Sequence, residues 1–419
     1  MGEYLVRGGN KISGEISVSG AKNAILPILA SVILNKGESV IYNCPLISDT
    51  YVSIKILDAL GCTTKLEGNT LTINSKNANN HIVPEELVRE MRSSFIFLGG
   101  VLSRFGKVKI SYPGGCELGA RPIDLHLKAL KALNATVKEE HGFIICEGTK
   151  LQGTRINLDF PSVGATENAM LTAVLAKGET IISNAAKEPE VVDLQFFLNA
   201  MGAKIKGAGT DSITISGVSS LHDVEYKIMP DRIVAGTYLA ASAMTGGDIV
   251  LHDVVYEDLY PILSRLNEAG CLFKIQRNSV SMKSPKKLKS IERLRTHPHP
   301  GFPTDMQPQF MSLLTIADGT SIVNETVFES RNKHIGELIR MGADIILAQD
   351  GVTSIIKGIE KLKGSTVSAR DLRGGAALIL AGLVAEGETI VLNSSYVERG
   401  YECIEKSLAS LGADITFKK

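Results

Sequence analysis

Cys116 is the residue whose neighbours most clearly suggest chemistry. It lies in the segment 111–127, SYPGGCELGARPIDLHL, directly after two glycines and five residues before Arg121. Glycines give a loop conformational freedom, and a cation near a thiol lowers the thiol pKa and increases the fraction present as reactive thiolate. We therefore predict a mobile loop that carries a reactive cysteine to a substrate. The alternative is a thiol tolerated by chance in a flexible turn.

The other five cysteines have no such setting. None of them forms a CxxC pair, and none has a histidine at the spacing of a zinc site. Four lie in apolar or strand-like segments, and the fifth lies where a helix is expected to begin, so we expect inert, small hydrophobic side chains. In chain order they are Cys44, Cys62, Cys146, Cys271 and Cys403.

Charged and polar side chains recur where the sequence pattern predicts the start of a helix. A helix N-terminus offers unpaired backbone N–H groups and about half a positive charge, and it therefore attracts anions. If these helices point into one cleft, we expect the cleft to bind a small polyanion. Six residues precede predicted buried helices (Lys22, Asn23, Asp231, Arg232, Asp305 and Arg373), and four precede predicted surface helices (Arg121, Glu188, Arg331 and Arg399).

Each of these residues, taken alone, has a simpler interpretation. Asp305, in the segment FPTDMQPQF, could serve only as a helix N-cap, an interaction worth about 1 kcal/mol. A single arginine or lysine in a loop is usually a solvated surface group. The recurrence of basic groups at equivalent places along the chain favours a binding site over these simpler interpretations.

Composition limits the class of protein. The 419 residues include 45 basic and 45 acidic side chains, and this balance argues against a general nucleic-acid binder. No apolar run approaches the roughly 20 residues of a membrane span, and the N-terminus does not resemble a signal peptide, so we expect a cytoplasmic protein. The chain has no Walker loop, no strand followed by GxGxxG, and no third ligand near His297 and His299. It therefore indicates no cofactor and no metal.

The chain contains a repeated unit of a helical stripe, a glycine or asparagine, and one or two strands. Glycine and asparagine suit the left-handed residue that ends many helices. The six marker residues are Gly61, Asn134, Gly202, Gly270, Gly342 and Gly412, at spacings of 73, 68, 68, 72 and 70. A unit of this size is large enough to be a supersecondary block.

A second element repeats in phase with the first. It is a helix with almost no charge in its middle, a turn with glycine, and a strand, as in ATENAMLTAVLAKGETIISN (165–184). Because a helix that is apolar all round is buried, we place these helices inside and the charged ones outside. Each unit then has the order βαβαββ, and six units suggest two domains of three. A single solenoid is less consistent, since solenoid repeats usually run about 20 to 50 residues.

These six units, together with the loop PGGCELGARPIDLHL, resemble the enolpyruvyl transferase family. The resemblance extends from GAKNA (20–24) to ERGYE (398–402). It implies an α/β fold of two domains, each an inside-out α/β barrel (α/β prism) of three βαβαββ units. In that family the first strands return to the second domain. We therefore expect one domain at 21–230 and the other at 1–20 plus 231–419.

The loop is most similar to that of the branch of the family that uses UDP-N-acetylglucosamine. This implies transfer of the enolpyruvyl group of phosphoenolpyruvate to the sugar 3′-hydroxyl with release of phosphate, the first committed step of peptidoglycan synthesis. The expected partners are these two small molecules, with no nucleic acid and no membrane. The oligomeric state is not indicated, and a monomer is compatible with the sequence. An epoxide of the fosfomycin type should alkylate Cys116.

The resemblance also implies roles for particular residues. Cys116 would protonate or add to phosphoenolpyruvate, and Asp305 would accept the hydroxyl proton. The catalytic set is Cys116, Asp305, Lys22 and Arg399, and the substrate-binding set is Lys22, Asn23, Arg92, Arg121, Pro122, Ile123, Asp124, Leu125, Ser162, Val163, Gly164, Asp305, Val327, Arg373 and Arg399. Within these sets Lys22, Arg121 and Arg399 match phosphate-binding positions, and Arg373 would lie near the developing charge.

One position departs from the family pattern. Some members carry a lysine that reaches the diphosphate where this chain has Phe160. Diphosphate binding must then depend more on Arg92, Arg121 and backbone amides, and the assignment of Ser162 to Gly164 is weakened accordingly.

Three other functions are compatible with parts of the pattern. The sister enzyme 5-enolpyruvylshikimate-3-phosphate synthase shares the fold and reaction class, but its signature lacks the cysteine loop. A non-catalytic, ligand-sensing homologue would not need Cys116, Asp305 and Lys22 together. A repeat scaffold for protein partners would not need a cationic cleft.

Overall fold

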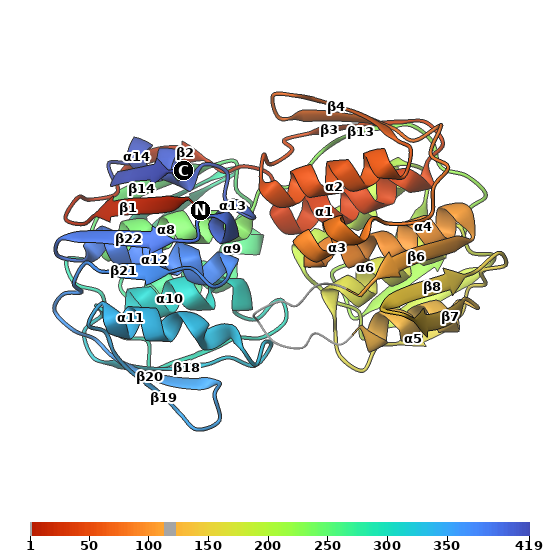
Figure 1. Ribbon diagram of the computed structural model, residues 1–419. Helices are drawn as coiled ribbons and strands as arrows, with labels where there is room; N and C mark the ends of the chain where they lie inside the picture. The colour runs from red at the N-terminus through yellow and green to blue at the C-terminus, as the bar shows by residue number, and fades with distance from the viewer. Residues whose placement is uncertain (1, 113–122) are drawn as a thin grey trace. The chain divides into compact units, whose positions relative to one another are not determined.

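The structure is a computed structural model that describes residues 2–112 and 123–419, with the side chain of Arg92 left out (Figure 1). The predicted site residues Cys116, Arg121 and Pro122 lie outside the described residues. The chain forms two compact units. The first unit comprises residues 20–112 and 123–229, and the second comprises residues 2–19 and 230–419.

The first unit contains the first three repeats. Each has a buried helix, a strand, an outer helix and a two-stranded hairpin. The elements are α1 (Lys22–Ser31), β3 (Glu38–Tyr42), α2 (Ser48–Ala59), β4 (Thr63–Glu67) and β5 (Thr70–Asn74); α4 (Phe97–Phe105), β6 (Lys107–Ser111), α5 (Asp124–Ala132), β7 (Thr136–Glu140) and β8 (Phe143–Glu147); and β9 (Arg155–Asn157), α6 (Val163–Ala173), β10 (Glu179–Ser183), α7 (Pro189–Ala200), β11 (Lys204–Lys206) and β12 (Ser212–Ser216). The remaining elements are η1 (Val32–Leu34), α3 (Glu85–Glu90), η2 (Arg92–Ile96) and β13 (Val224–Lys227).

The second unit contains the last three repeats. The elements are α8 (Arg232–Thr245), β14 (Asp248–His252), α9 (Tyr256–Glu268), β15 (Leu272–Gln276) and β16 (Ser279–Lys283); β17 (Arg293–Arg295), η3 (Thr304–Met306), α10 (Gln307–Leu314), β18 (Thr320–Asn324), η4 (Arg331–His334), α11 (Ile335–Arg340), β19 (Asp344–Leu347) and β20 (Thr353–Lys357); and β21 (Thr366–Ser368), α12 (Leu372–Val384), β22 (Glu388–Leu392), α13 (Ser395–Glu398), α14 (Ile404–Ser410) and β23 (Asp414–Lys418). The N-terminal strands β1 (Glu3–Arg7) and β2 (Gly14–Ser17) also belong to this unit.

The helices predicted to be internal are internal. In the second unit every residue of α10 is buried, and in α8 every residue except Thr245 is buried. Helices α8, α10 and α12 pack against one another in the middle of this unit, and its sheets lie around them (Figure 1). In the first unit α4 packs on both α1 and α6. Apolar surface on all sides of these helices drives their enclosure.

The strand after each buried helix has a burial pattern that shows which face of each sheet packs on the helices. In all six such strands (β3, β6, β10, β14, β18 and β22) the second and fourth residues are buried. Because side chains alternate across a strand, this pattern turns one face of each sheet toward the helices and leaves the other toward solvent. The inside-out α/β arrangement of six βαβαββ repeats is therefore confirmed.

Two features of the sheets depend on segments far apart in the sequence. The last repeat supplies only β23 for its hairpin, and β1 takes the middle place, antiparallel to both β22 and β23. In addition, β2 precedes α1 but pairs in parallel with β14, whereas β13 precedes α8 but pairs in parallel with β3. Each unit therefore uses the strand that leads, in sequence, into the other unit.

The six marker residues all adopt positive φ. Asn134 has φ +69°, and the five glycines have φ between +93° and +105°. This confirms their predicted place at helix ends, where a left-handed residue closes the last turn. Cys44, Cys62, Cys146 and Cys271 are buried, in keeping with small hydrophobic side chains, and Cys403 lies at a helix start as expected but is exposed, with φ +44°.

No helix within residues 2–112 and 123–419 is both long enough and apolar enough to cross a membrane.

A glycine directly after the hairpin packs against the turn that follows the buried helix of the same repeat. A Cβ on Gly358 would lie 1.6 Å from the carbonyl oxygen of Ala317, and a Cβ on the equivalent Gly217 would lie 1.6 Å from that of Ala176. We expect Gly358→Ala to lower the free energy of unfolding by about 3 kcal/mol, because a backbone carbonyl cannot move aside cheaply. Urea denaturation measures this change.

Gly336 provides the matched control. It lies in α11 of the same unit, and a Cβ there would meet no atom within 4 Å. Gly336→Ala should leave stability unchanged or raise it by about 0.5 kcal/mol, since alanine is the better helix former. If the Gly358→Ala and Gly336→Ala variants had equal free energies of unfolding, the close approach at Gly358 would not contribute to stability.

Candidate active site

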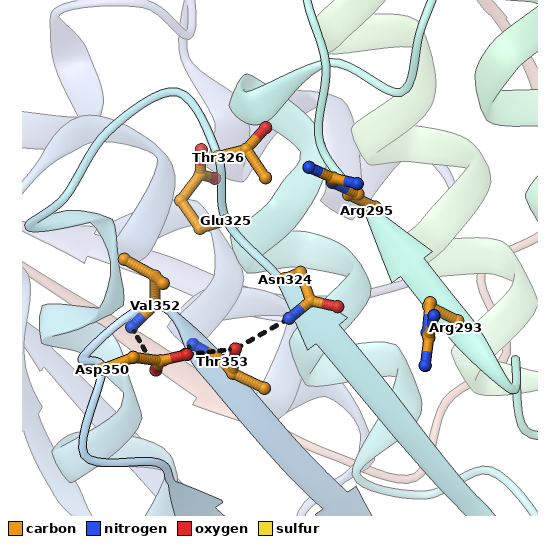
Figure 2. Close-up of a pocket in the computed structure, with 8 residues that line it drawn as sticks. All are labelled: Arg293, Arg295, Asn324, Glu325, Thr326, Asp350, Val352 and Thr353. Atoms are coloured by element: carbon orange, nitrogen blue, oxygen red, sulfur yellow. Dashed lines mark hydrogen bonds between the residues drawn. The ribbon is translucent and has the colours of Figure 1, made fainter.

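The surface cavities of the second unit do not coincide with the residues predicted to do chemistry. One cavity, of about 320 Å³, lies beside β17, β18 and β20 and is lined by Arg293, Arg295, Asn324, Glu325, Thr326, Asp350, Val352 and Thr353 (Figure 2). Another, of about 600 Å³, is lined by residues at the ends of α8, α12 and β16. The candidate site is therefore built from side-chain clusters.

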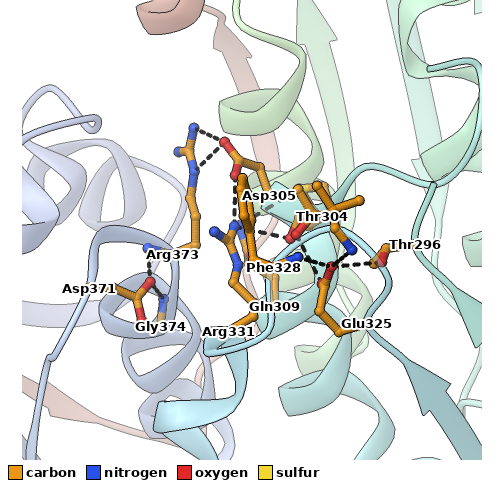
Figure 3. Close-up of polar contacts among 12 residues, drawn as sticks. Thr296, Thr304, Asp305, Gln309, Glu325, Phe328, Arg331, Asp371, Arg373 and Gly374 are labelled. Atoms are coloured by element: carbon orange, nitrogen blue, oxygen red, sulfur yellow. Dashed lines mark hydrogen bonds and ion pairs between the residues drawn. The ribbon is translucent and has the colours of Figure 1, made fainter. Parts of the chain in front are cut away.

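Asp305 lies between two buried arginines of the second unit and forms a charged cluster with them. Its Oδ1 accepts a hydrogen bond from Nη2 of Arg331 at 2.7 Å, and its Oδ2 accepts bonds from Nη2 and Nε of Arg373 at 3.1 and 3.3 Å (Figure 3). Both arginine side chains are only 2% exposed, whereas the Asp305 side chain is 24% exposed. The carboxylate is thus held from within and open to solvent on one side.

The charges of this cluster stabilise one another. Burial alone would raise the pKa of Asp305, but Arg373 and Arg331 more than offset burial and hold that pKa well below its ordinary value. For Arg373, burial would lower the pKa, but Tyr401, Asp305 and Asp231 raise it above its ordinary value. Asp305 and Arg373 are therefore both ionised at neutral pH.

The N-termini of the three buried helices of the second unit come together at this cluster. Asp231 caps α8 by accepting from the N–H groups of Ile233 and Val234, and Asp371 caps α12 by accepting from those of Arg373 and Gly374. Asp305, at the start of the α10 segment, makes no such cap and bonds the two arginines. The interpretation of Asp305 as only an N-cap is therefore wrong.

The exact places of several basic residues differ from the prediction. Lys22, Arg232 and Arg373 were expected to precede their helices, but each lies within the first turn. The reason is that Ala21, Asp231 and Asp371 take the N-cap positions. Arginine and lysine side chains are long enough to reach the helix end from the first turn.

Aromatic rings support both arginines. The guanidinium carbon of Arg373 lies 5.3 Å from the ring centroid of Tyr401, and that of Arg331 lies 5.6 Å from the ring centroid of Phe328. Arg399 follows α13, two residues before Tyr401, and is partly buried. Cation–π contacts of this kind fix the plane of a guanidinium.

Lys22 forms a buried ion pair in the first unit. Its Nζ lies 2.6 Å from Oδ2 of Asp49, and the two side chains are 9% and 2% exposed. Asn23, the next residue of α1, is partly buried. Because Lys22 starts α1 and Asp49 lies in the first turn of α2, the pair joins the N-termini of two neighbouring helices.

The remaining predicted residues of the first unit lie at the starts of α5 and α6. Ile123 to Leu125 begin α5, and Ser162 to Gly164 begin α6, where Ser162 caps Ala165. A Cβ on Gly164 would lie 3.0 Å from Cε1 of His126, so glycine lets α5 approach α6. The structure thus brings these two predicted groups together.

Asn168 holds this arrangement together. Its Nδ2 lies 2.8 Å from Nδ1 of His126 and donates to the carbonyl of Phe95, while its Oδ1 accepts from the N–H of Gly99. Phe95 belongs to η2, which begins at Arg92. One buried amide therefore links the segment of Arg92 to the starts of α5 and α6.

Sequence reasoning missed several of these partners. Asp49 and Asn168 are buried polar residues within helices, and Glu325 is a buried polar residue directly after β18. The only signal was a polar residue within a largely apolar run, as in ATENAMLTAVL. Buried polar groups require partners, but the sequence does not show which partners fold against them.

The chain resembles proteins of known activity over its whole length. A family model described as EPSP synthase (3-phosphoshikimate 1-carboxyvinyltransferase) matches residues 6–408. UDP-N-acetylglucosamine 1-carboxyvinyltransferase 2 of Caldanaerobacter subterraneus subsp. tengcongensis is 51% identical over 415 residues, which cover 99% of each chain. UDP-N-acetylglucosamine 1-carboxyvinyltransferase 1 of Symbiobacterium thermophilum is 50% identical over 419 residues, which cover 99% of this chain and 94% of the relative.

Solved structures show the same fold. The enolpyruvyl transferase NikO of Streptomyces tendae superimposes with a TM-score of 0.89 at 24% identity, covering 100% of this chain and 99% of NikO. EPSP synthase of Acinetobacter baumannii superimposes with a TM-score of 0.77 at 19% identity, covering 100% of both chains. The repeats, the charged helix starts and these matches lead to one conclusion: the chain belongs to the EPSP synthase family of enolpyruvyl transferases.

Proposed function

We propose that the chain transfers the enolpyruvyl group of phosphoenolpyruvate to the 3′-hydroxyl of UDP-N-acetylglucosamine and releases inorganic phosphate. The observation that carries this proposal is identity of 46–51% over nearly the full length to relatives named UDP-N-acetylglucosamine 1-carboxyvinyltransferase. The reaction would take place in the cytoplasm as the first committed step of peptidoglycan synthesis, which cell division and cell shape require.

The reaction has two steps. In the addition, the sugar 3′-oxygen bonds to C2 of phosphoenolpyruvate, the hydroxyl proton passes to a base, and C3 gains a proton. In the elimination, C3 loses a proton and the C2–O bond to phosphate breaks. We assign the proton on C3 to Cys116, whose thiol can also form an adduct with phosphoenolpyruvate.

Asp305 is our candidate for the group that receives the hydroxyl proton. Its ion pairs with Arg331 and Arg373 make it a weak base before reaction. The hydroxyl becomes much more acidic as its oxygen bonds to C2, so proton transfer would follow the formation of that bond. Until then the carboxylate would orient the hydroxyl by accepting its hydrogen bond.

The basic residues supply the charge that the anionic substrate needs. Lys22, Arg121 and Arg399 are proposed to bind the phosphate, and Arg373 to stabilise charge near C2. The buried Arg373 is supported for this role because Tyr401 and Asp305 fix its orientation before substrate binds. A fixed cation costs no reorganisation during the reaction.

The UDP group is proposed to lie against the starts of α5 and α6. The N–H groups in the first turn of a helix bind phosphate oxygens, and Gly164 allows the two helix starts to lie close together. Asn23, Arg92, Asp124 and Val327 complete the proposed contacts. Phe160, 44% exposed, offers no charge to the diphosphate.

The substrate pair is tested by phosphate release. With phosphoenolpyruvate and UDP-N-acetylglucosamine together we expect phosphate and one enolpyruvyl product per phosphate, identified by mass spectrometry. Neither phosphoenolpyruvate alone nor phosphoenolpyruvate with shikimate 3-phosphate should release phosphate.

Two outcomes would contradict the proposal. Turnover only with shikimate 3-phosphate would assign the chain to the sister activity. Binding of UDP-N-acetylglucosamine without any phosphate release would indicate a ligand-sensing protein.

Replacing Asp305 tests its proposed role. We expect Asp305→Asn to lower kcat by about 10³-fold, because asparagine cannot accept the proton. Since Arg373 and Arg331 hold the pKa of Asp305 below its ordinary value, the wild-type enzyme should lose activity through this group only below about pH 4. Steady-state kinetics at pH 7 measure the first effect, and a wild-type profile without loss through this group between pH 4 and 9 bears out the second.

Glu388→Gln is the matched control for this substitution. Glu388 pairs with Arg7 at 2.9 Å on an exposed surface of the same unit, so kcat should stay within about twofold of the wild-type value. Full activity of a folded Asp305→Asn variant would remove Asp305 from the mechanism.

Alkylation tests the cysteine. An epoxide of the fosfomycin type should inactivate the enzyme and add one label at Cys116, detected by peptide mass spectrometry. Cys116→Asp should resist inactivation, with Cys403→Ser as the control because Cys403 is the exposed cysteine of the described residues. A label on Cys403 alone, or undiminished sensitivity of Cys116→Asp, would contradict the assignment.

A further inference from the structure

Glu325 is a buried carboxylate to which the proposed mechanism gives no role. It follows β18 directly and is only 2% exposed. Its Oε1 accepts hydrogen bonds from Thr296 Oγ1 at 2.9 Å, Val327 N at 2.7 Å and Phe328 N at 3.1 Å. Its Oε2 accepts from Thr304 Oγ1 at 2.9 Å. A carboxylate with four donors is fully satisfied without any cation.

The direction of these bonds is determined by their neighbours. The hydroxyl of Thr296 accepts from the N–H of Thr326 at 2.9 Å, so its own proton is available for Glu325. With two backbone N–H groups, Oε1 therefore faces three donors and must be an unprotonated acceptor. Oε2 faces only the Thr304 hydroxyl. Because a hydroxyl can also accept a hydrogen bond, a donor group could occupy the position of Oε2.

Glu325 does not use its charge to pair with the arginines of the adjacent cavity. It lines that cavity with Arg293 and Arg295 (Figure 2), yet within the described chain no ion pair joins it to either. The donors to its carboxylate instead come from two segments of the chain, one that leads into Asp305 and one that leads into Arg331.

Those two segments carry the residues of the cluster. One runs from Thr296 to Asp305, and Thr304 directly precedes the carboxylate that would meet the substrate. The other runs from Val327 to Arg331. Arg331 Nη2 donates to the backbone carbonyl of Thr304 at 3.0 Å as well as to Asp305 (Figure 3). Thr304 is thus held on its side chain by Glu325 and on its backbone by Arg331.

We propose that Glu325 is a positioning residue for enolpyruvyl transfer, which acts through the Thr304 hydroxyl to set the place of the Asp305 carboxylate between Arg331 and Arg373. The inference rests on the proposed function. An oriented hydroxyl-binding carboxylate must keep its geometry to a fraction of an ångström, and Glu325 fixes both segments that determine this geometry. It touches neither substrate in this assignment, and its direct link to the residue beside Asp305 runs through Thr304.

Two substitutions isolate the link between Glu325 and Thr304. Thr304→Val removes the hydroxyl and keeps the shape of the side chain. Glu325→Gln can keep a carbonyl oxygen toward its three donors, while its amide N–H takes the place of Oε2 and can only donate to the Thr304 hydroxyl, which replaces the charged hydrogen bond by a weaker neutral one. Both variants should therefore fold, and both should lower kcat by about tenfold, the effect expected from one hydrogen bond to a charged group. KM for phosphoenolpyruvate should change by less than about twofold, since its proposed ligands are untouched.

Three further measurements separate positioning from simple loss of stability. Thr304→Ser keeps the hydroxyl and should restore at least half of the wild-type kcat. In Thr304→Val the acid limb of kcat/KM should move to higher pH, because a displaced Arg331 would lower the pKa of Asp305 less. The double variant Thr304→Val/Glu325→Gln should be no slower than the slower single variant, since each substitution removes the same charged bond from the Thr304 hydroxyl to Oε2.

Thr64→Val is the matched control. Thr64 Oγ1 donates to Oδ1 of Asp58 at 2.7 Å on an exposed surface of the first unit, the same kind of hydroxyl-to-carboxylate bond away from the cluster. This variant should keep the wild-type kcat and pH profile.

The outcomes distinguish this inference from the proposed function. If the wild-type enzyme fails to release phosphate from both substrates, the proposed function is wrong. Hydrogen exchange still tests the link, because Thr304→Val should then accelerate exchange in residues 325–331. If the wild-type enzyme is active but Thr304→Val and Glu325→Gln keep its kcat and pH profile, or if their effects multiply in the double variant, the positioning role is wrong.

Discussion

Six helices whose surfaces are apolar on nearly every side are stable in water only when other elements enclose them. This constraint explains most of the architecture. Three helices form the centre of the second unit, and the sheets turn alternate side chains onto them. A helix enclosed along its sides can meet solvent only at its ends, so polar and charged residues gather there. The site is thus a consequence of how the core is enclosed.

The three buried helices of the second unit each have an aspartate at or near their start, but only one of these aspartates is free of a capping role. Asp231 and Asp371 cap the helices of the fourth and sixth repeats. In the fifth repeat, eight residues separate β17 from η3, and Asp305 is turned away from the helix N–H groups toward Arg331 and Arg373. A residue type that stabilises a helix in two repeats becomes an accessible, ionised carboxylate in the third.

Much of the fold follows from short-range patterns in the sequence. The left-handed residues from Gly61 to Gly412, the alternating strands and the uncharged helices each depend on local physics, and the structure confirms them. The completion of the last sheet by β1 and the crossing of β2 and β13 depend on pairings over hundreds of residues. A strand shows in its sequence that it needs a partner but not which partner it takes.

Within the site, too, some residues could be found from local sequence, whereas others depend on contacts between distant segments. Asp305 and Arg373 could be found because a charge beside an apolar helix is conspicuous, whereas Glu325 and Asn168 could not be assigned a role. Their roles arise from four or fewer hydrogen bonds to segments distant in sequence. A buried carboxylate surrounded by neutral donors lowers the energy of only one arrangement of the segments around it. Such residues contribute no charge to the substrate. They determine which of several arrangements of the charged side chains is the stable one.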